Sequence, residues 1–137
     1  MFYIAKINKL YDVDQLHLII QNKQKNIVHS LNKEDFIHYL DGSYKCWYDR
    51  SFSNPGPDNI KRLLNLNMFY PIYVLDIVND EEAKEIFIDE YNNGIKYIII
   101  DGCHRVYYAT FIDPENHPKI EALIIPFDDL KKCEIKY

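Results

Sequence analysis

The stretch that decides the fold reads Ile95-Lys96-Tyr97-Ile98-Ile99-Ile100-Asp101-Gly102-Cys103-His104-Arg105. Its first six residues are mostly β-branched or aromatic, which predicts a strand covered by other parts of the protein. Asp101-Gly102 interrupts this run, because glycine is favoured in turns and weakens regular strands. No helix breaker follows Arg105 until Asp113-Pro114, so a helix is predicted over residues 105–112. The stretch therefore predicts a strand, a tight turn and a helix.

Such a turn attracts anions, because the first backbone N–H groups of the helix lie free beside it. Gly102 allows close backbone approach, His104 can donate from a ring nitrogen, and Arg105 offers a planar fork of donors that suits phosphate. Cys103 is expected at the positive end of the helix and next to a cation, and both favour the thiolate form of its side chain. Asp101 can ligate magnesium, act as a base or cap the helix. An ordinary structural turn with an inert cysteine shows the same spacing.

Two further strands flank this stretch. Residues 70–78 form a β-branched and aromatic run with little alternation, as in a strand that is covered on both faces. Residues 120–126 predict another strand, followed by a turn or helix from Phe127 to Leu130. Between them, residues 79–91 favour a helix with Asn79 and Glu82 as a capping box, although a hairpin turning at 93–94 remains open.

The first half of the chain is less informative. Residues 2–7 predict a short strand, and residues 14–21 fit a helix or a strand equally. A short helix is expected at residues 33–40. Two prolines and a glycine predict a loop at residues 51–57, and a helix is expected from there to about residue 66. The histidines show no spacing typical of a metal site.

Composition limits the function classes. The chain has 137 residues, 47% of them hydrophobic, which suits a single domain with one substantial core. Its net charge of -5 has the wrong sign for a protein that coats nucleic acid. Three cysteines are too few for a disulfide framework, and no run approaches the roughly 18 apolar residues of a membrane span. We therefore expect a cytoplasmic protein without a membrane partner and without nucleic acid as its main partner.

The signature at residues 101–105, followed by Val106-Tyr107-Tyr108-Ala109, resembles that of the ParB/sulfiredoxin superfamily, in which such an element binds nucleotide phosphate. Residues 71–75 and 96–100 are similar to the strands before that signature, and residues 118–123 to the strand after it. The resemblance implies an α+β fold with a small mixed sheet and helices packed mainly on one face. It assigns residues 51–137 to the family core and leaves residues 1–50 as an N-terminal extension of the same single domain.

The resemblance also implies a nucleotide-binding enzyme that uses ATP or a related nucleotide with Mg²⁺ for phosphoryl transfer, as a kinase does, or for hydrolysis. The acceptor is an unknown small molecule or protein. The backbone around Gly102 would hold phosphate, cations would neutralise its charge, His104 would stabilise the transferred group, and Asp101 would hold Mg²⁺ or act as base. The implied site residues are Asp101, Gly102, Cys103, His104 and Arg105, with Lys61 or Arg62 from the preceding helix.

Two alternatives remain open. The pattern is closest to sulfiredoxins, whose cysteine corresponds to Cys103, so a thiol-dependent reductase that uses Cys103 as nucleophile is the second hypothesis. Sulfiredoxins have glycine where this chain has Asp101. The superfamily's free-serine kinases share Asp-Gly but need a separate carboxylate base, for which Glu34 and Asp49 are the guesses. The third hypothesis is a non-catalytic module that binds protein or DNA.

Overall fold

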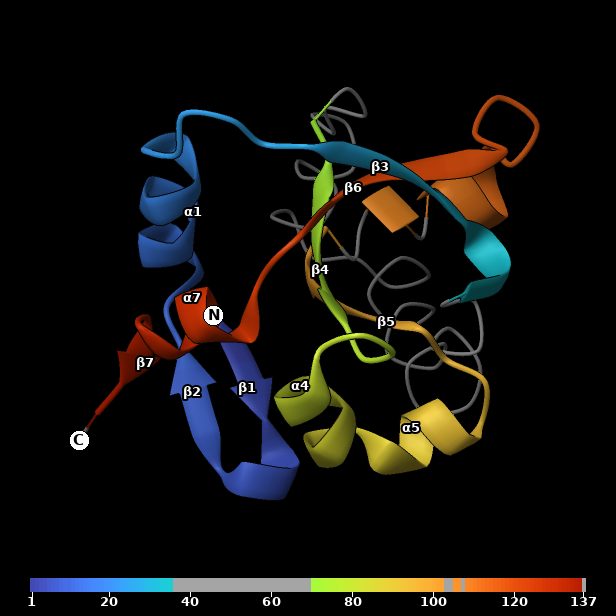
Figure 1. Ribbon diagram of the computed structural model, residues 1–137. Helices are drawn as coiled ribbons and strands as arrows, with labels where there is room; N and C mark the ends of the chain where they lie inside the picture. Colours follow the sequence, from blue (N-terminus) through green and yellow to red (C-terminus); the bar gives the residue numbers. More distant parts are fainter. Residues whose placement is uncertain (36–69, 103–104, 107, 137) are drawn as a thin grey trace, which may run out of the picture.

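The computed structural model describes residues 1–35, 70–102, 105–106 and 108–136, which form a small α+β fold with two sheets (Figure 1). The predicted α+β class with a small mixed sheet is thereby confirmed. Several predictions fall outside the described residues and are not tested by the structure. They concern the loop at 51–57, the helix after it with Lys61 and Arg62, Asp49, and the pair Cys103 and His104.

The larger sheet contains the three strands that the sequence predicts. Its strand order is β3-β6-β4-β5. The central strand β4 (Ile72–Asp76) runs parallel to β6 (Lys119–Ile124) and antiparallel to β5 (Tyr97–Asp101). An additional strand, β3 (Val28–Asn32), pairs antiparallel with β6 and was not predicted. The sheet is therefore mixed, and β4 has a partner on both sides.

Both faces of this sheet are buried. Tyr73 and Leu75 of β4 belong to one core cluster, whereas Ile72 and Val74 belong to another. Because side chains alternate along a strand, the two clusters lie on opposite faces. The first cluster continues into residues of the helices α1 (Val13–Gln21), α4 (Glu81–Ile86) and α7 (Phe127–Lys131). The second continues into the helical segment after Gly102. Burial on both faces explains why β4 reads as an unbroken apolar run.

The smaller sheet joins the two ends of the described chain. β1 (Phe2–Ile4), β2 (Lys9–Tyr11) and β7 (Glu134–Ile135) pair antiparallel in that order. The strand predicted at residues 2–7 is therefore too long, because Ala5–Ile7 forms a 3-10 helix, η1. Asn8 follows it with φ of 51°, and this left-handed residue reverses the chain between β1 and β2.

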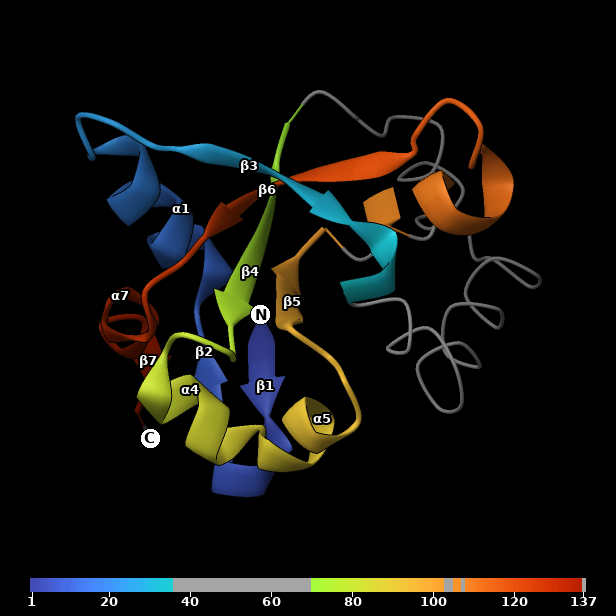
Figure 2. The ribbon, with the colours of Figure 1, turned by 45° about the vertical axis from the view of Figure 1, so that its right-hand side comes forward.

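Helix α1 (Val13–Gln21) settles the ambiguity left by the sequence between helix and strand. The side chain of Asp12 caps its start, because Oδ1 accepts hydrogen bonds from the backbone N–H groups of Asp14 and Gln15. Leu16 and Ile20, four residues apart, are both buried in the core. Figures 1 and 2 show α1 beside the four-stranded sheet, above α7 and the smaller sheet.

The helix predicted over residues 79–91 is confirmed as two short helices, α4 (Glu81–Ile86) and α5 (Ile88–Asn92). The predicted capping box is wrong. Asp80, not Asn79, caps α4, since its Oδ1 accepts from Ala83 N at 3.2 Å. The side chain of Asn79 instead donates to Asp76 at the end of β4. The negative charge of Asp80 also interacts favourably with the N-terminus of the helix.

The chain is again helical from Arg105, and Tyr108–Ile112 forms a π-helix, η4, that stops before Asp113-Pro114 as predicted. The ammonium group of Lys33 donates to Ala109 O at 2.6 Å and to Pro114 O at 3.4 Å, so a cation satisfies carbonyls near this helix end. Lys33 begins the 3-10 helix η2 (Lys33–Asp35), which is the described part of the helix expected at residues 33–40.

The last helix, α7 (Phe127–Lys131), follows β6 and leads into β7. It carries a buried carboxylate, Asp129, whose Oδ2 lies 2.5 Å from Lys23 Nζ. This ion pair ties α7 to the residues that follow α1. Within the described ranges, no helix is long and apolar enough to cross a membrane.

Candidate functional site

The change from strand to helix occurs at Gly102. β5 ends at Asp101, and Gly102 has φ of 109°, a conformation that residues with a side chain rarely adopt. The N–H of Val106 donates to Gly102 O at 3.0 Å, and this spacing of four residues is that of an α-helical hydrogen bond. The described residues on both sides of the turn therefore have the order strand, glycine, helix that the sequence predicts.

Packing also requires glycine at this position. Gly102 is buried, and a Cβ atom added to it would lie 2.7 Å from Ile72 Cβ and 3.2 Å from Arg105 Nη2. The first distance is shorter than real Cβ contacts allow. The absence of a side chain thus lets the turn lie against the start of β4 and against the guanidinium group of Arg105.

Arg105 is held in place by the backbone at the start of β4. Its Nη1 donates to Tyr70 O at 2.7 Å and to Pro71 O at 3.0 Å, and its Nη2 lies 3.7 Å from Asp101 Oδ2. The side chain is only 16% exposed, whereas that of Asp101 is 50% exposed. The sequence assigns the guanidinium group of Arg105 to phosphate binding. One of its nitrogens, Nη1, instead joins the turn to the start of β4.

Arg105 and Ile72 also line a cavity of about 510 Å³ at this end of the sheet. The lining includes two cationic side chains, Arg105 and Lys119, and one carboxylate, Glu121. The volume lies in the range of small-molecule sites in proteins. The complete lining consists of Ser30, Tyr70, Ile72, Arg105, Asn116, His117, Pro118, Lys119, Ile120 and Glu121.

The loop between η4 and β6 forms one wall of this cavity. His117 Nε2 lies 3.7 Å from Asp113 Oδ2, and the imidazole meets the ring of Tyr108 edge to face at 5.9 Å. Asn116 donates to both carboxylate oxygens of Asp113. Sequence analysis offers no reason to place His117 at a site, because the fold of this loop is what brings Asp113 and Tyr108 to its ring.

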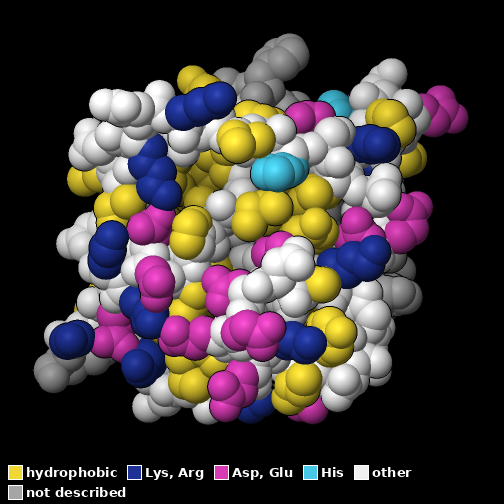
Figure 3. All heavy atoms as spheres, in the orientation of Figure 1, with side chains coloured by type: hydrophobic (Ala, Val, Ile, Leu, Met, Phe, Trp, Pro, Cys, Tyr) yellow, Lys and Arg dark blue, Asp and Glu magenta, His cyan; other side chains and the backbone are white. Residues whose placement is uncertain are grey.

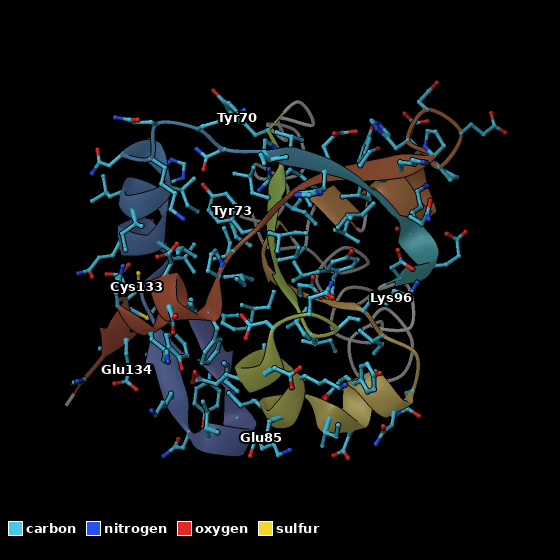
Figure 4. The ribbon with its side chains drawn as sticks, viewed as in Figure 1. Tyr70, Tyr73, Glu85, Lys96, Cys133 and Glu134 are labelled. Atoms are coloured by element: carbon cyan, nitrogen blue, oxygen red, sulfur yellow. The ribbon has the colours of Figure 1, made fainter. Side chains whose placement is uncertain are left out.

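A second feature that sequence reasoning missed lies on the other side of β4. The Nδ1 atom of His17 in α1 lies 2.5 Å from the hydroxyl oxygen of Tyr73 in β4, and Gln21 Nε2 lies 3.0 Å from His17 Nε2. Figure 4 shows Tyr73 on the side of β4 that faces α1, and Tyr70 near the start of that strand. The phenol and the imidazole are also stacked, with ring centroids 6.0 Å apart.

Tyr73 lies next to Asp101 in the sheet. The two residues are paired across β4 and β5, and a β-bulge follows directly, because Val74 pairs with Ile99 and leaves Ile100 unpaired. Burial raises the pKa of Tyr73, and the charge of Asp101 raises it further, while Arg105 opposes this rise. The phenol therefore stays protonated well beyond neutral pH.

Of the predicted site residues, the structure brings Asp101, Gly102 and Arg105 together. Cys103, His104, Lys61 and Arg62 lie outside the described residues. Glu34, a guess for the base, is an exposed residue of η2.

Cys133 is buried, its Sγ donates to Asp129 O, and burial raises its thiol pKa, so it is not an activated nucleophile. Among the side chains that the structure describes, no three of His, Cys, Asp or Glu converge as ligands of a metal ion.

Comparison with models of protein families, with curated proteins and with solved structures gives no match. The chemistry of the site must therefore be inferred from its own residues.

Proposed function

We propose that this chain is a nucleotide-binding enzyme of the ParB/sulfiredoxin-like type, which uses ATP or a related nucleotide for phosphoryl transfer or hydrolysis. The observation that supports this best is the position of the Arg105 guanidinium group. It lies beside the left-handed Gly102 and on the wall of the 510 Å³ cavity. A fixed guanidinium group next to a turn without a side chain suits the close approach of a phosphate group.

The two carbonyl contacts of Arg105 favour this function, because they orient the guanidinium group before any ligand arrives. An ordered donor loses little conformational entropy when it binds phosphate. The contacts use Nη1. We therefore assign Nη2, the nitrogen on the side of Gly102 and Asp101, as the donor to phosphate.

The cavity offers the other groups that a nucleotide needs. Lys119 supplies a second cation, in the role that the sequence assigned to Lys61 or Arg62. Tyr70, Ile72 and Ile120 provide an aromatic and apolar surface on which a base could stack. Ser30 and Asn116 add polar groups. A phosphate near Arg105 and a base near these apolar residues would place one nucleotide along the cavity.

Asp101 suits a role with Mg²⁺. Magnesium is usually held by one or two carboxylates together with phosphate oxygens, and Asp101 presents a half-exposed carboxylate close to Arg105. Asp101 would hold the ion, which would neutralise charge on the phosphates. The thiol-dependent alternative depends on Cys103, which lies outside the described residues, and no described residue favours it.

Titration calorimetry tests this function directly. ATP, ADP and CTP, each with Mg²⁺, are titrated at fixed salt into the wild-type protein and into the Arg105→Ala and Arg105→Lys variants. We expect saturable binding of at least one nucleotide. Affinity should fall about 10- to 100-fold in Arg105→Ala, as expected when a charged hydrogen bond worth about 1.5–3 kcal/mol is lost. Arg105→Lys should bind with intermediate affinity.

Lys96→Ala is the matched control. Lys96 precedes β5, at the opposite end from Gly102, and its exposed ammonium group pairs with Asp35 at 3.4 Å. Its removal changes the net charge as Arg105→Ala does but should leave the affinity unchanged. Circular dichroism must first show that each variant is folded. Absence of binding by the wild type, or equal affinity in wild type and Arg105→Ala, would contradict the proposed function.

A further inference from the structure

The loop between η4 and β6 brings a histidine and a carboxylate together at the wall of the cavity. His117 lines the cavity, and its Nε2 atom lies 3.7 Å from Oδ2 of Asp113. Both side chains are partly buried, with 25% of the histidine and 32% of the aspartate exposed. The pair therefore places a group that can accept a proton at the cavity, with a negative charge beside it.

Hydrogen bonds fix the carboxylate of Asp113. The side-chain amide of Asn116 donates to Oδ1 at 3.0 Å and to Oδ2 at 3.1 Å. The backbone N–H of Asp113 donates to Tyr108 O at 2.9 Å, and this spacing of five residues continues the π-helical pattern of η4. Because both carboxylate oxygens and the backbone are held, the carboxylate keeps one orientation towards the imidazole.

The imidazole of His117 is held as well. Its ring meets the ring of Tyr108 edge to face, with centroids 5.9 Å apart. The backbone N–H of His117 donates to Pro114 O at 3.3 Å, and the same carbonyl accepts from the ammonium group of Lys33 in η2. The loop thus holds the ring at the cavity before any ligand arrives, so little conformational entropy is lost on binding.

The carboxylate also determines which nitrogen of His117 can act as a base. In a neutral imidazole, one nitrogen carries the proton and the other accepts a proton or a hydrogen bond. Asp113 favours the proton on Nε2, because a carboxylate only accepts hydrogen bonds. The lone pair of Nδ1 is then the basic one. When Nδ1 takes up a proton, the charge of Asp113 stabilises the imidazolium that forms.

Water and the proposed phosphate groups share this part of the molecule. Residues 114–116 are exposed, and Figure 3 shows the loop at the upper right, where it reaches the surface among side chains of both charges. Arg105 and Lys119, the cations that we assign to phosphate, line the same cavity as His117. A water molecule beside a bound phosphate would therefore lie in a cavity that also contains a base.

We propose that His117 is the catalytic base of the nucleotide site, that Asp113 is its positioning residue, and that the acceptor of the phosphoryl group is water. This inference rests on the proposed function and narrows it to hydrolysis. Water is the acceptor that needs no binding site of its own. The assignment also supplies the base for which the sequence offered only Glu34 and Asp49, and it places that base in the loop after η4.

In the proposed step, the oxygen of water forms a bond to the terminal phosphorus of the nucleoside triphosphate while the bond from that phosphorus to the bridging oxygen breaks. The nucleoside diphosphate leaves with the electron pair of the broken bond, and inorganic phosphate is the second product. Water gives one proton to Nδ1 of His117 as it attacks. The imidazolium then releases a proton to solvent, which restores the neutral ring.

The test measures affinity for MgATP and the steady-state release of ADP and phosphate in the wild type, His117→Ala and Asp113→Asn. His29→Ala is the matched control, because His29 is an exposed histidine of β3 that does not line the cavity. We expect both test variants to be folded by circular dichroism and to bind MgATP within about threefold of the wild type. With KM nearly unchanged, kcat should fall about 100-fold in His117→Ala and about 10-fold in Asp113→Asn.

Two further readouts separate catalysis from a structural role. Added imidazole should restore part of the rate in His117→Ala, where the ring has left a space, but not in Asp113→Asn, where the ring is present. Asp113→Glu, which restores the negative charge, should recover part of the rate lost in Asp113→Asn. The control His29→Ala should keep the wild-type rate and show no response to imidazole.

The outcomes distinguish this inference from the function on which it rests. Wild-type kcat in His117→Ala, together with intact MgATP binding, would overturn the inference and leave the nucleotide site standing. MgATP binding by the wild type without release of phosphate would overturn it in the same way. No binding of MgATP by the wild type would refute the proposed function itself, and this inference with it.

Discussion

The Nδ1 atom of His17 lies 2.5 Å from the hydroxyl oxygen of Tyr73, although the two residues are 56 positions apart in the chain. Because His17 is exposed, water can replace the lost partner when Tyr73 is changed to phenylalanine. We predict that Tyr73→Phe lowers the free energy of unfolding by less than about 1 kcal/mol. Urea denaturation followed by circular dichroism measures this change.

Leu75→Ala is the comparison for that measurement. Leu75 follows Tyr73 on the same face of β4 and is fully buried, so its truncation should cost about 2–5 kcal/mol. A loss in Tyr73→Phe as large as that in Leu75→Ala would mean that the hydroxyl group mainly holds the fold together. The small loss that we predict would instead show that the hydroxyl group of Tyr73 contributes little to the stability of the fold.

The turn at Gly102 should tolerate no side chain. Gly102→Ala introduces a Cβ into a residue with φ of 109° and forces it against Ile72, so we predict a loss of about 3 kcal/mol or more. Gly94→Ala is the matched control, because Gly94 has φ of 87° but nothing within 4 Å of an added Cβ. It should lose only about 1 kcal/mol. Equal losses in the two variants would show that the close packing against Ile72 contributes nothing.

The acid stability of the protein should depend on Asp129. Burial acts to raise its pKa, but hydrogen bonds and charges from Lys23 and Lys132 outweigh burial and hold the pKa below its ordinary value of 3.8. The carboxylate of Asp129 therefore binds a proton less readily in the folded protein than in the unfolded chain. The stabilisation is complete at pH values above the ordinary pKa and is lost as the pH falls through the lowered pKa of the folded state.

We predict that Asp129→Asn lowers the free energy of unfolding at neutral pH by about 1–3 kcal/mol and makes stability less dependent on pH below about 4. Asp128→Asn is the control, since Asp128 is its neighbour in α7 but is 84% exposed. It should change stability by less than about 0.5 kcal/mol. Thermal unfolding from pH 2 to pH 7 distinguishes the variants, and parallel curves for the wild type and Asp129→Asn would contradict the prediction.

Alkaline pH should destabilise the protein through buried tyrosines. The pKa of Tyr11 is raised, first by burial and then by the charges of Glu134 and Glu82. The folded state thus holds the phenolic proton more tightly than the unfolded chain. Its contribution to stability is present at pH values below 10 and is lost as the pH rises through the raised pKa of the folded state.

Absorbance at 295 nm during an alkaline titration measures tyrosine ionisation. We predict that part of the absorbance change is delayed beyond pH 10 and coincides with unfolding, and that Tyr11→Phe weakens this dependence of stability on pH. Tyr3→Phe is the control, because Tyr3 is 54% exposed in the neighbouring strand. Ionisation of all tyrosines near pH 10 in a folded protein would be inconsistent with the burial of Tyr11.

The sequence predicts the central strands well because strands that are buried on both faces contain runs of consecutive apolar residues. β4 and β5 each begin with four consecutive apolar or aromatic residues, and this composition is strong enough to identify them without knowledge of their partners. The turn at Gly102 is equally local, since glycine both ends the strand and adopts the left-handed conformation. The same holds for the stop of the helical segment before Pro114.

Features that depend on distant partners were missed. β3 has only one buried residue, Leu31, and is a strand because it pairs with β6. Asp80 caps α4 and also accepts from Phe127 N, a contact between segments that are far apart in the sequence. The pair of His17 and Tyr73 is of the same kind. No local pattern reveals such contacts, because the fold alone brings them together.

The most direct test of the phosphate site is a titration of the ¹⁵N-labelled protein with MgATP, followed by amide chemical shifts in NMR spectra. We predict saturable shifts for the backbone amides of Gly102, Arg105 and Lys119, with one common dissociation constant, and no shifts for the strands β1, β2 and β7. Inorganic triphosphate with Mg²⁺ should shift Gly102 and Arg105 in the same way. Unchanged amides at Gly102 and Arg105, at nucleotide concentrations that shift residues elsewhere, would contradict the proposal that this turn binds phosphate.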